Sequence, residues 1–277
     1  MENFDAWIGK KEISHDVVTA RPIAMMQALL NESNKTVNIL PHLYHWFYFL
    51  PLVDSKEISE DGHPLKGSFL PPIPFPKRMW AGSRFQFLNP IHVNQHIRRE
   101  SEILNVELKH GKSGDMYFVT VKHSIFTEEK LAIIEEHDIV YRDASNQAQT
   151  SKPVTHSEKT FSYKKFFPVN TVTLFRYSAL TFNGHKIHYD RPYAIENEGY
   201  PGLVVHGPLL ATLLLHTFQQ ENPNKNISHF EFRAINPIFD FNEFSICGDI
   251  QTDQAELWIE KSDGQIAMKG KVQFQGG

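Results

Sequence analysis

One short pattern occurs once in each half of this chain. Phe85 to Ile91 reads Phe-Gln-Phe-Leu-Asn-Pro-Ile, and Phe230 to Ile238 repeats it with a two-residue insertion. Alternating phenylalanines place two rings on one face of a strand, and the proline that follows is confined to an edge or a bulge. Both copies therefore describe the same strand end. Duplication of one structural unit is the interpretation that constrains the fold most.

Strand and turn signals alternate after the first copy begins. Segments rich in β-branched and aromatic residues run from Arg84 to Ile91, Ile97 to Lys109, Tyr117 to Phe126 and Leu131 to Tyr141. The last three are separated by short polar breaks, which favour hairpins and an antiparallel arrangement. We predict a four-stranded meander in this order.

Helices and irregular segments are expected elsewhere. We predict one helix from Pro22 to Leu30, which begins with proline, and another from Leu209 to about Gln220, which begins just after Pro208. A strand is expected near Lys159 to Lys165. The aromatic stretch from Leu40 to Pro51 fits a buried helix or an apolar lining equally well. The prolines between Ser68 and Met79 predict an extended segment on the surface.

Residues 143–158 form a polar stretch with Val154 as their one large apolar side chain, so they cannot bury a face. We predict that they link an N-terminal domain, residues 1–142, to a C-terminal catalytic domain, residues 159–277. The predicted fold class is α+β, with two copies of one unit in which an antiparallel sheet accompanies a helix.

Composition excludes several classes of partner. The chain has 277 residues, a formal net charge of −4 and a pI near 6.4, which gives no basic stripe for nucleic acid. Cys247 is the single cysteine, which suits a reducing compartment and leaves no multi-cysteine zinc site. The acidic N-terminus lacks a signal-peptide pattern, and the apolar run from Leu209 to Leu215 is far short of the ~20 residues that span a bilayer. We expect a cytoplasmic protein without a membrane partner.

The stretch from Phe175 to Ala194 collects groups that can move protons. His188 is the best base, because histidine is the side chain whose unperturbed pKa, ~6.5, lies near neutral pH. Asn183 can position a water or a carbonyl but cannot be a general base, and it equally fits a turn before glycine. Asp190 can orient His188 or cap the short helix that Pro192 begins, and capping is the commoner role.

A helix start follows this loop at His206-Gly207-Pro208. Proline is harmless at the first helical position, and glycine lets another molecule approach the backbone. The Gly207 N–H is therefore a candidate donor to a developing oxyanion. Metal binding by His185, His188 and Asp190 is a minor alternative, because no third ligand has a defined spacing. We expect no metal and no cofactor.

The pattern from residue 175 to 212 resembles the MaoC-like enoyl-thioester hydratases, whose fold is the hotdog, a long helix wrapped by an antiparallel sheet, and the resemblance implies two copies of it. The likeness to the fused double-hotdog branch, which includes type 2 hydroxyacyl-thioester dehydratases and the itaconyl-CoA and mesaconyl-C4-CoA hydratases, spans nearly the whole chain. The further motifs that carry it are Ala20-Arg-Pro22, Leu43-Tyr-His45-Trp46, Phe69-Leu-Pro-Pro72, Arg78-Met-Trp80-Ala-Gly82, Asp138-Ile-Val-Tyr-Arg142 and Phe232-Arg233-Ala-Ile-Asn-Pro237.

This resemblance implies a hydro-lyase that adds water reversibly to an enoyl-CoA thioester, with coenzyme A as part of the substrate. It implies that His188 activates the water, Asn183 holds it, Gly207 N–H stabilises the enolate and His185 assists proton delivery to the α-carbon. The chain departs from the broad family, which has an aspartate at the position of Asn183 and usually an asparagine at that of His185. The histidine pattern is absent from the first half, which we expect to form a substrate wall and a pseudo-dimer interface.

Substrate contacts are less well specified by the sequence. A short branched or dicarboxylic acyl group, of the itaconyl or mesaconyl type, would need a cation, and the candidates are Arg176, Arg191 and Arg233, with His206 as a further substrate-binding residue. A 3-hydroxyacyl-thioester dehydratase that uses CoA or acyl carrier protein, a thioesterase and a non-catalytic acyl-thioester binding module stay open as alternatives. A homodimer formed through the helix after Gly207 stays open as well.

Overall fold

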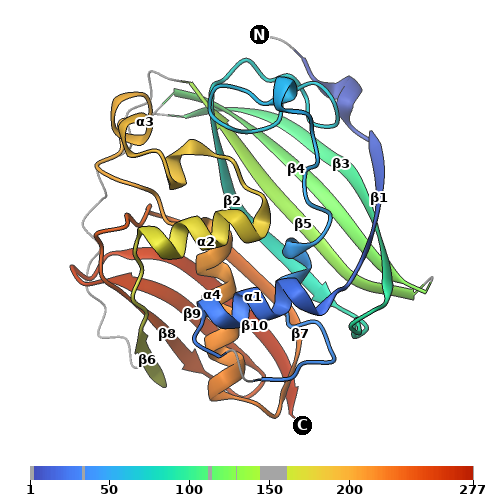
Figure 1. Cartoon of the computed structure of the whole chain (residues 1–277), viewed down its shortest axis with the longest axis vertical. Helices are drawn as coiled ribbons and strands as arrows, with labels where there is room; N and C mark the ends of the chain where they lie inside the picture. Colours follow the sequence, from blue (N-terminus) through green and yellow to red (C-terminus); the bar gives the residue numbers. More distant parts are fainter. Residues whose placement is uncertain (1–2, 33–34, 112–113, 129, 144–160, 277) are drawn as a thin grey trace.

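The computed structural model describes residues 3–32, 35–111, 114–128, 130–143 and 161–276, so the predicted linker falls almost wholly outside the described residues. Strands of the described part form one ten-stranded sheet in which every neighbouring pair is antiparallel (Figure 1). The strands are β1 (Lys11–Val17), β2 (Lys77–Phe87), β3 (His96–Gly111), β4 (Gly114–Thr127), β5 (Lys130–Arg142), β6 (Tyr163–Phe166), β7 (Lys225–Ala234), β8 (Phe244–Ile250), β9 (Gln254–Lys261) and β10 (Ile266–Gly276).

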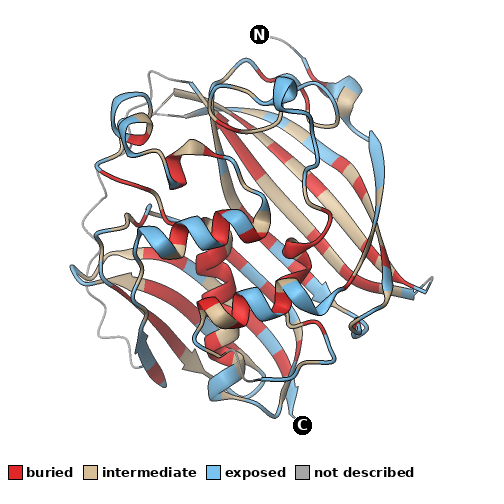
Figure 2. Ribbon diagram, in the orientation of Figure 1, coloured by how far each residue is buried: buried red, intermediate tan, exposed pale blue. Residues whose placement is uncertain are grey.

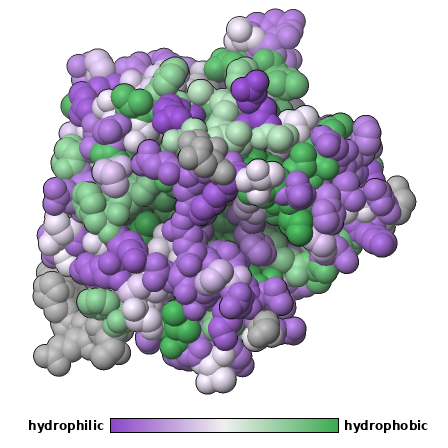
Figure 3. Space-filling model, turned by 60° about the horizontal axis from the view of Figure 1, so that its bottom comes forward, coloured by the Kyte–Doolittle hydropathy of each residue, from purple (hydrophilic) through white to green (hydrophobic). Residues whose placement is uncertain are grey.

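Helices are few and short. The α-helices are α1 (Ala20–Leu29), α2 (Thr171–Thr181), α3 (Arg191–Glu196) and α4 (Gly207–Glu221), and the 3-10 turns are η1 (Asp5–Trp7), η2 (Tyr44–Phe47), η3 (Ser55–Glu57) and η4 (Lys186–His188). Within the described ranges, none of these helices has the length and apolar character that a membrane crossing requires. Figure 3 shows hydrophobic residues as separate patches among hydrophilic ones on one face of the molecule.

The strand order confirms the duplicated unit. From the outer edges to the centre, the halves run β1-β3-β4-β5-β2 and β6-β8-β9-β10-β7, so each strand has a counterpart in the other half. The two copies of the Phe-x-Phe motif meet at the centre, where β2 pairs with β7 and Phe85 lies opposite Phe230. Their rings stack with centroids 6.0 Å apart. The seam between the halves is therefore made of main-chain hydrogen bonds.

The predicted meander is wrong in one respect. β3, β4 and β5 are successive hairpin neighbours, as expected, but β2 pairs with β5 and not with β3. Turn residues specify only the strands that they join, whereas the place of β2 depends on its partner β7 in the other half. The sequence analysis also missed β1, an edge strand whose side chains are mostly exposed.

The two halves differ in what covers their sheet. In the C-terminal half, α4 packs against β7 to β10 and is buried along most of its length, as the red helix in Figure 2 shows. The N-terminal half has only α1, of ten residues, followed by a mostly irregular segment up to β2. Within that segment the aromatic stretch from Leu40 to Pro51 contains the short 3-10 turn η2 and lines a cavity. Of the two predicted alternatives, the apolar lining is therefore the one observed.

That cavity has a volume of about 1380 Å³ and is lined by residues of both halves. The loop from Asn183 to Tyr189, which is the expected catalytic loop, borders it on one side, and the inner faces of β3, β4 and β5 border it on the other. Because no long helix covers the N-terminal sheet within the described residues, the space that such a helix would fill stays open for a ligand.

Candidate active site

His188 has the geometry of a general base. Its Nδ1 donates to the carbonyl oxygen of Val204 at 2.7 Å, which leaves Nε2 as the acceptor nitrogen of the neutral ring. The residue lines the cavity although only 7% of it is exposed. Burial lowers the pKa of His188 to about 4, although its bond to Val204 acts in the opposite direction. At neutral pH the ring is therefore uncharged and able to accept a proton.

His206 supports that ring from behind. The two imidazoles are stacked with centroids 3.7 Å apart, and the Nε2 atom of His206 is 2.8 Å from the hydroxyl oxygen of Ser178 in α2. His206 is fully buried, and it is not among the described residues that line the cavity. Its position gives no support to the predicted role in substrate binding. We assign it to the positioning of His188.

Gly207 begins α4 beside the same cavity. The first N–H groups of a helix have no intrahelical acceptor and carry the positive end of the helix dipole. A Cβ atom built on Gly207 would have no heavy atom within 4 Å, so a ligand can approach this backbone. Pro208 follows in the first turn, as predicted. This arrangement suits a donor to a thioester oxygen that becomes negative during the reaction.

Asn183 has the predicted turn role. Helix α2, which occupies part of the stretch expected to be a loop, ends at Phe182 in the left-handed conformation with φ of 50°. The Oδ1 atom of Asn183 then accepts a hydrogen bond of 3.0 Å from the backbone N–H of His185. Asn183 also lines the cavity, so its amide nitrogen is the atom left to hold a water.

Asp190 acts as a helix cap. Its Oδ1 accepts from the backbone N–H of Tyr193 at 3.1 Å, at the start of α3. The shape of the loop thus depends on Asn183 at one end and Asp190 at the other, while His185 and His188 lie between them. The ring centroids of these two histidines are 5.4 Å apart, with the planes perpendicular.

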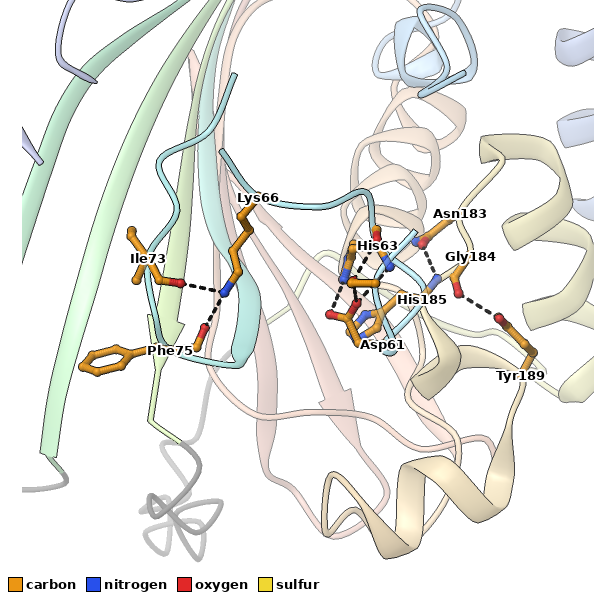
Figure 4. A network of polar contacts seen from close by, with 10 residues as sticks. Asp61, His63, Lys66, Ile73, Phe75, Asn183, Gly184, His185 and Tyr189 are labelled. Carbon is orange, nitrogen blue, oxygen red and sulfur yellow. Dashed lines mark hydrogen bonds and ion pairs between the residues drawn. The ribbon is translucent and has the colours of Figure 1, made fainter. Parts of the chain in front are cut away.

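The sequence analysis missed a contribution from the N-terminal half. Asp61 and His63 lie directly against the catalytic loop, and the His63 and His185 rings are 4.1 Å apart between centroids (Figure 4). The Asp61 carboxylate is 2.9 Å from Nδ1 of His63. Nothing in the spacing of these residues along the chain links them to His185, although Asp61-Gly62 is a typical turn pair. The first half therefore contributes polar side chains to the site in addition to the expected wall and interface.

A second polar group covers the N-terminal end of the cavity. Glu135 is buried and accepts hydrogen bonds from His45, Trp46 and Ser83, at 3.1 to 3.3 Å. Burial would raise the pKa of this carboxyl, but its bond to His45 and nearby histidines lower it to about 2, so Glu135 is ionised. His45 is buried in this network and also lines the cavity.

The predicted cations lie elsewhere. Arg176 and Arg233 are exposed, Arg191 pairs with Asp240, and none of the three is among the described residues that line the cavity. The cations that do line it are Lys66, Arg78, Arg99, Arg142 and Lys186. Their positions could not be inferred from the sequence, because strand pairing between the halves decides which arginines face inward.

Comparisons with known proteins identify the family and the fold of the chain. The profile of the family "Hydroxyacyl-thioester dehydratase type 2" matches residues 43–240. Mesaconyl-C(4)-CoA hydratase of Chloroflexus aurantiacus is 42% identical over 274 residues, which cover 98% of each chain. A MaoC-like dehydratase of Phytophthora capsici superposes with a TM-score of 0.71 at 10% identity and covers all of both chains.

A Mycobacterium tuberculosis protein described as a double hotdog superposes with a TM-score of 0.57 at 10% identity, covering 97% of this chain and 96% of the other. The predicted α+β double-hotdog fold is thus confirmed. Together with the family profile and the full-length relative, it places the protein among the hydro-lyases. The chain belongs to the type 2 hydroxyacyl-thioester dehydratase family, a MaoC-like hotdog family.

Proposed function

We propose that this protein adds water reversibly to a short dicarboxylic or branched enoyl-CoA thioester of the mesaconyl-C4-CoA type. The full-length relative at 42% identity supports this substrate class. The observation that carries it is Arg78, a cation that lines the cavity and forms no ion pair with any described residue. Its positive charge contributes to lowering the pKa of His63, His185 and His137. The guanidinium therefore lies within electrostatic range of the His63–His185 pair and of His137 in β5. A substrate carboxylate is the partner that such a cation needs.

The polar N-terminal end of the cavity argues for the same class. Arg99 lines it with no ion pair among the described residues, and its Nε atom is buried without a hydrogen-bond partner. Ionised Glu135 and the neutral imidazoles of His123 and His137 lie in the same lining. A long alkyl chain placed against these groups would exclude water from them and would leave the Arg99 Nε atom without a partner, which costs free energy. A short polar acyl group leaves room for the water that they require.

In the proposed reaction, the Nε2 atom of His188 takes a proton from a water molecule held by Asn183. The oxygen of that water forms a bond to the β-carbon, and the electron pair of the double bond moves to the thioester oxygen at Gly207 N–H. His185 then takes part in proton delivery to the α-carbon. General base catalysis of this kind contributes about 10²- to 10⁴-fold to a rate, and a preformed oxyanion donor contributes a comparable factor.

The test is to incubate the protein with mesaconyl-C4-CoA, itaconyl-CoA and crotonyl-CoA and to follow the loss of enoyl absorbance and the product mass. The dicarboxylic substrates should have the higher kcat/KM. His188→Ala should reduce kcat by at least about 100-fold while the circular dichroism spectrum stays unchanged. The exposed His229, in β7, offers His229→Gln as a matched histidine control. Full activity of His188→Ala would contradict the proposal.

A second candidate is the dehydration of a longer 3-hydroxyacyl thioester. The family profile is named for that reaction, and the cavity of about 1380 Å³ has apolar lining residues near its N-terminal loops, including Ile58, Leu65, Phe69 and Leu70. In that case kcat/KM should rise with acyl chain length in a series of 3-hydroxyacyl-CoA thioesters. A preference that falls with chain length would exclude this candidate.

A further inference from the structure

The chain segment around Asp61 is built as a rigid support. The Oδ1 atom of Asp61 accepts hydrogen bonds from the Ser59 hydroxyl and from the backbone N–H of His63, and Oδ2 is 2.9 Å from Nδ1 of His63. Ser59 also donates to the carbonyl oxygen of His63 at 2.8 Å. With Nδ1 of His63 committed to the carboxylate, its Nε2 is the nitrogen left for another partner.

This segment docks onto the catalytic loop of the other half. The backbone N–H of Lys186 donates to the carbonyl oxygen of Asp61 at 2.9 Å. Two glycines make the approach close, since a Cβ atom on Gly62 would lie 1.8 Å from the carbonyl oxygen of Gly184. The close packing of the Gly62 and Gly184 backbones fixes the segment relative to His185.

The side chains then form a continuous line, as Figure 4 shows for its first part. Asp61, His63 and His185 each contribute one side-chain nitrogen or oxygen atom to a group whose atoms all lie within 4.8 Å of one another. The His185 ring in turn lies edge-to-face against His188, the proposed base, with centroids 5.4 Å apart. The line therefore runs from an N-terminal carboxylate through two imidazoles to the site of water activation.

The charges along this line suit a proton in transit. Burial lowers the pKa of His63. The pKa of His185 is lowered by its own burial and by the neighbouring His63 and His188. Burial would raise the pKa of Asp61, but its bonds to His63 and Ser59 lower it below its usual range. The resting site thus holds neutral imidazoles beside one ionised carboxylate. A proton placed on the histidine pair would gain a counter-ion.

Asn183 cannot serve as a second proton-transfer group. Its Oδ1 is bonded to the loop backbone, and a carboxamide cannot exchange a proton. A site that moves a proton from water to carbon needs a place to hold it between the two events.

We propose that Asp61 and His63 of the N-terminal half act through His185 as the second proton-transfer group of the active site. The inference rests on the proposed hydration. One O–H bond of water breaks, and His188 receives that proton while the C–O bond forms. The proton passes to the His63–His185 pair, where Asp61 balances its charge, and it leaves from His185 to form the C–H bond at the α-carbon. Dehydration follows the same steps in reverse. Asp61 and His63 are positioning residues in this scheme.

Metal binding by the same three residues is the competing reading. Asp61, His63 and His185 could offer three ligand atoms. However, both carboxylate oxygens already accept hydrogen bonds within the segment, so a cation would have to displace Nδ1 of His63 from Asp61. The observed bonds favour the proton-transfer role.

The test compares His63→Asn, Asp61→Asn and the control His229→Gln in the full-length protein. Asparagine at residue 63 can place its amide nitrogen near the position of Nδ1, so it keeps a donor for Asp61 but removes Nε2. We measure kcat and KM for hydration and the exchange of the product α-hydrogen in D2O. Both variants should lose kcat and α-hydrogen exchange by about 100-fold, with KM within about twofold. Thermal unfolding should be unchanged in His63→Asn, whereas Asp61→Asn should also lose stability, because the ionised carboxylate is bonded in the folded state.

Several outcomes would overturn the inference. If His63→Asn keeps wild-type kcat and exchange, the role of His63 is structural. If the purified protein carries one equivalent of a divalent metal, and a chelator removes both metal and activity, the cluster is a metal site. An inactive wild type on every thioester would contradict the proposed function itself, whereas an active wild type with a fully active His63→Asn contradicts this inference alone.

Discussion

Gly62 of the N-terminal half touches Gly184 of the catalytic loop so closely that a Cβ atom on Gly62 would lie 1.8 Å from the Gly184 carbonyl oxygen. That oxygen also accepts a hydrogen bond of 2.8 Å from the Tyr189 hydroxyl, so it cannot shift freely. The loop that holds the catalytic histidines is therefore held in place by the half that lacks the histidine pattern.

Gly62→Ala should push the segment around Asp61 away from the loop that holds His185 and His188. Gly62 has φ of +92°, so alanine adds backbone strain to the clash with Gly184. We expect kcat to fall by at least about tenfold and the free energy of unfolding to fall by about 1 to 3 kcal/mol. Gly9→Ala is the matched control, because Gly9 has φ of +83° with open space around its Cβ position. Equal losses in both variants would show that strain alone is responsible, and steady-state kinetics with urea unfolding can decide.

Arg78→Ala should change substrate preference. Loss of a charged hydrogen bond to a substrate carboxylate should raise KM for mesaconyl-C4-CoA by about 10- to 100-fold. KM for crotonyl-CoA, which has no second carboxylate, should change by less than about threefold. Arg176→Ala removes an exposed arginine away from the cavity and should leave both values unchanged. Parallel loss with both substrates in Arg78→Ala would argue against a carboxylate contact.

Substitution of Asn183 can separate its two roles. Asn183→Ala removes the acceptor for His185 N–H and should lower both kcat and the free energy of unfolding, the latter by about 1 kcal/mol. Asn183→Asp keeps that acceptor but loses the amide donor, so stability should be retained while kcat falls by about tenfold or more. If Asn183→Asp has wild-type kcat, the amide serves the turn only.

Stability should depend on pH in a defined window. Burial lowers the pKa of His188, His137 and His42 to about 4 each, with further contributions from neighbouring groups. Unfolded histidine has a pKa of ~6.5, so the folded state binds fewer protons between these values. The free energy of unfolding is then at its full value above pH ~6.5 and declines as the pH falls towards about 4.

We expect a loss of at least about 2 kcal/mol between pH 7 and pH 5, measured by urea unfolding. The carboxyl of Glu135, with a pKa of about 2, contributes to the pH dependence only at lower pH. A urea midpoint that is constant from pH 7 to pH 5 would contradict these histidine assignments.

The sequence predicts the local parts of this site well and the contacts between the halves poorly. Asn183, His188 and Gly207 are brought together by one loop and one helix start, so their order along the chain is enough to propose their association. The turn role of Asn183 and the capping role of Asp190 follow from residue type. These are interactions over a few residues.

Asp61, His63 and Arg78 show the opposite case. Arg78 reaches the site because β2 belongs to a sheet that continues into the other half, whereas Asp61 and His63 lie in the irregular segment before β2 and reach it through the contact of Gly62 with Gly184. The meander prediction failed for the same reason, since turn chemistry cannot specify that β2 pairs with β7. Arg176 and Arg233 were chosen for their place in the motif, and the structure leaves both exposed outside the cavity.

The pairing of Phe85 with Phe230 has a consequence for how such an enzyme can change its substrate. Successive residues of β2 face opposite sides of the sheet, so a one-residue slip before Phe85 would turn both Trp80 and Arg78, which line the cavity, to the other face. That slip would rebuild the wall that β2 gives the cavity, and it would displace the preceding segment, in which the Asp61 carbonyl oxygen accepts from the Lys186 N–H of the loop with His188. Substrate specificity and the support of the catalytic histidines are therefore coupled through β2.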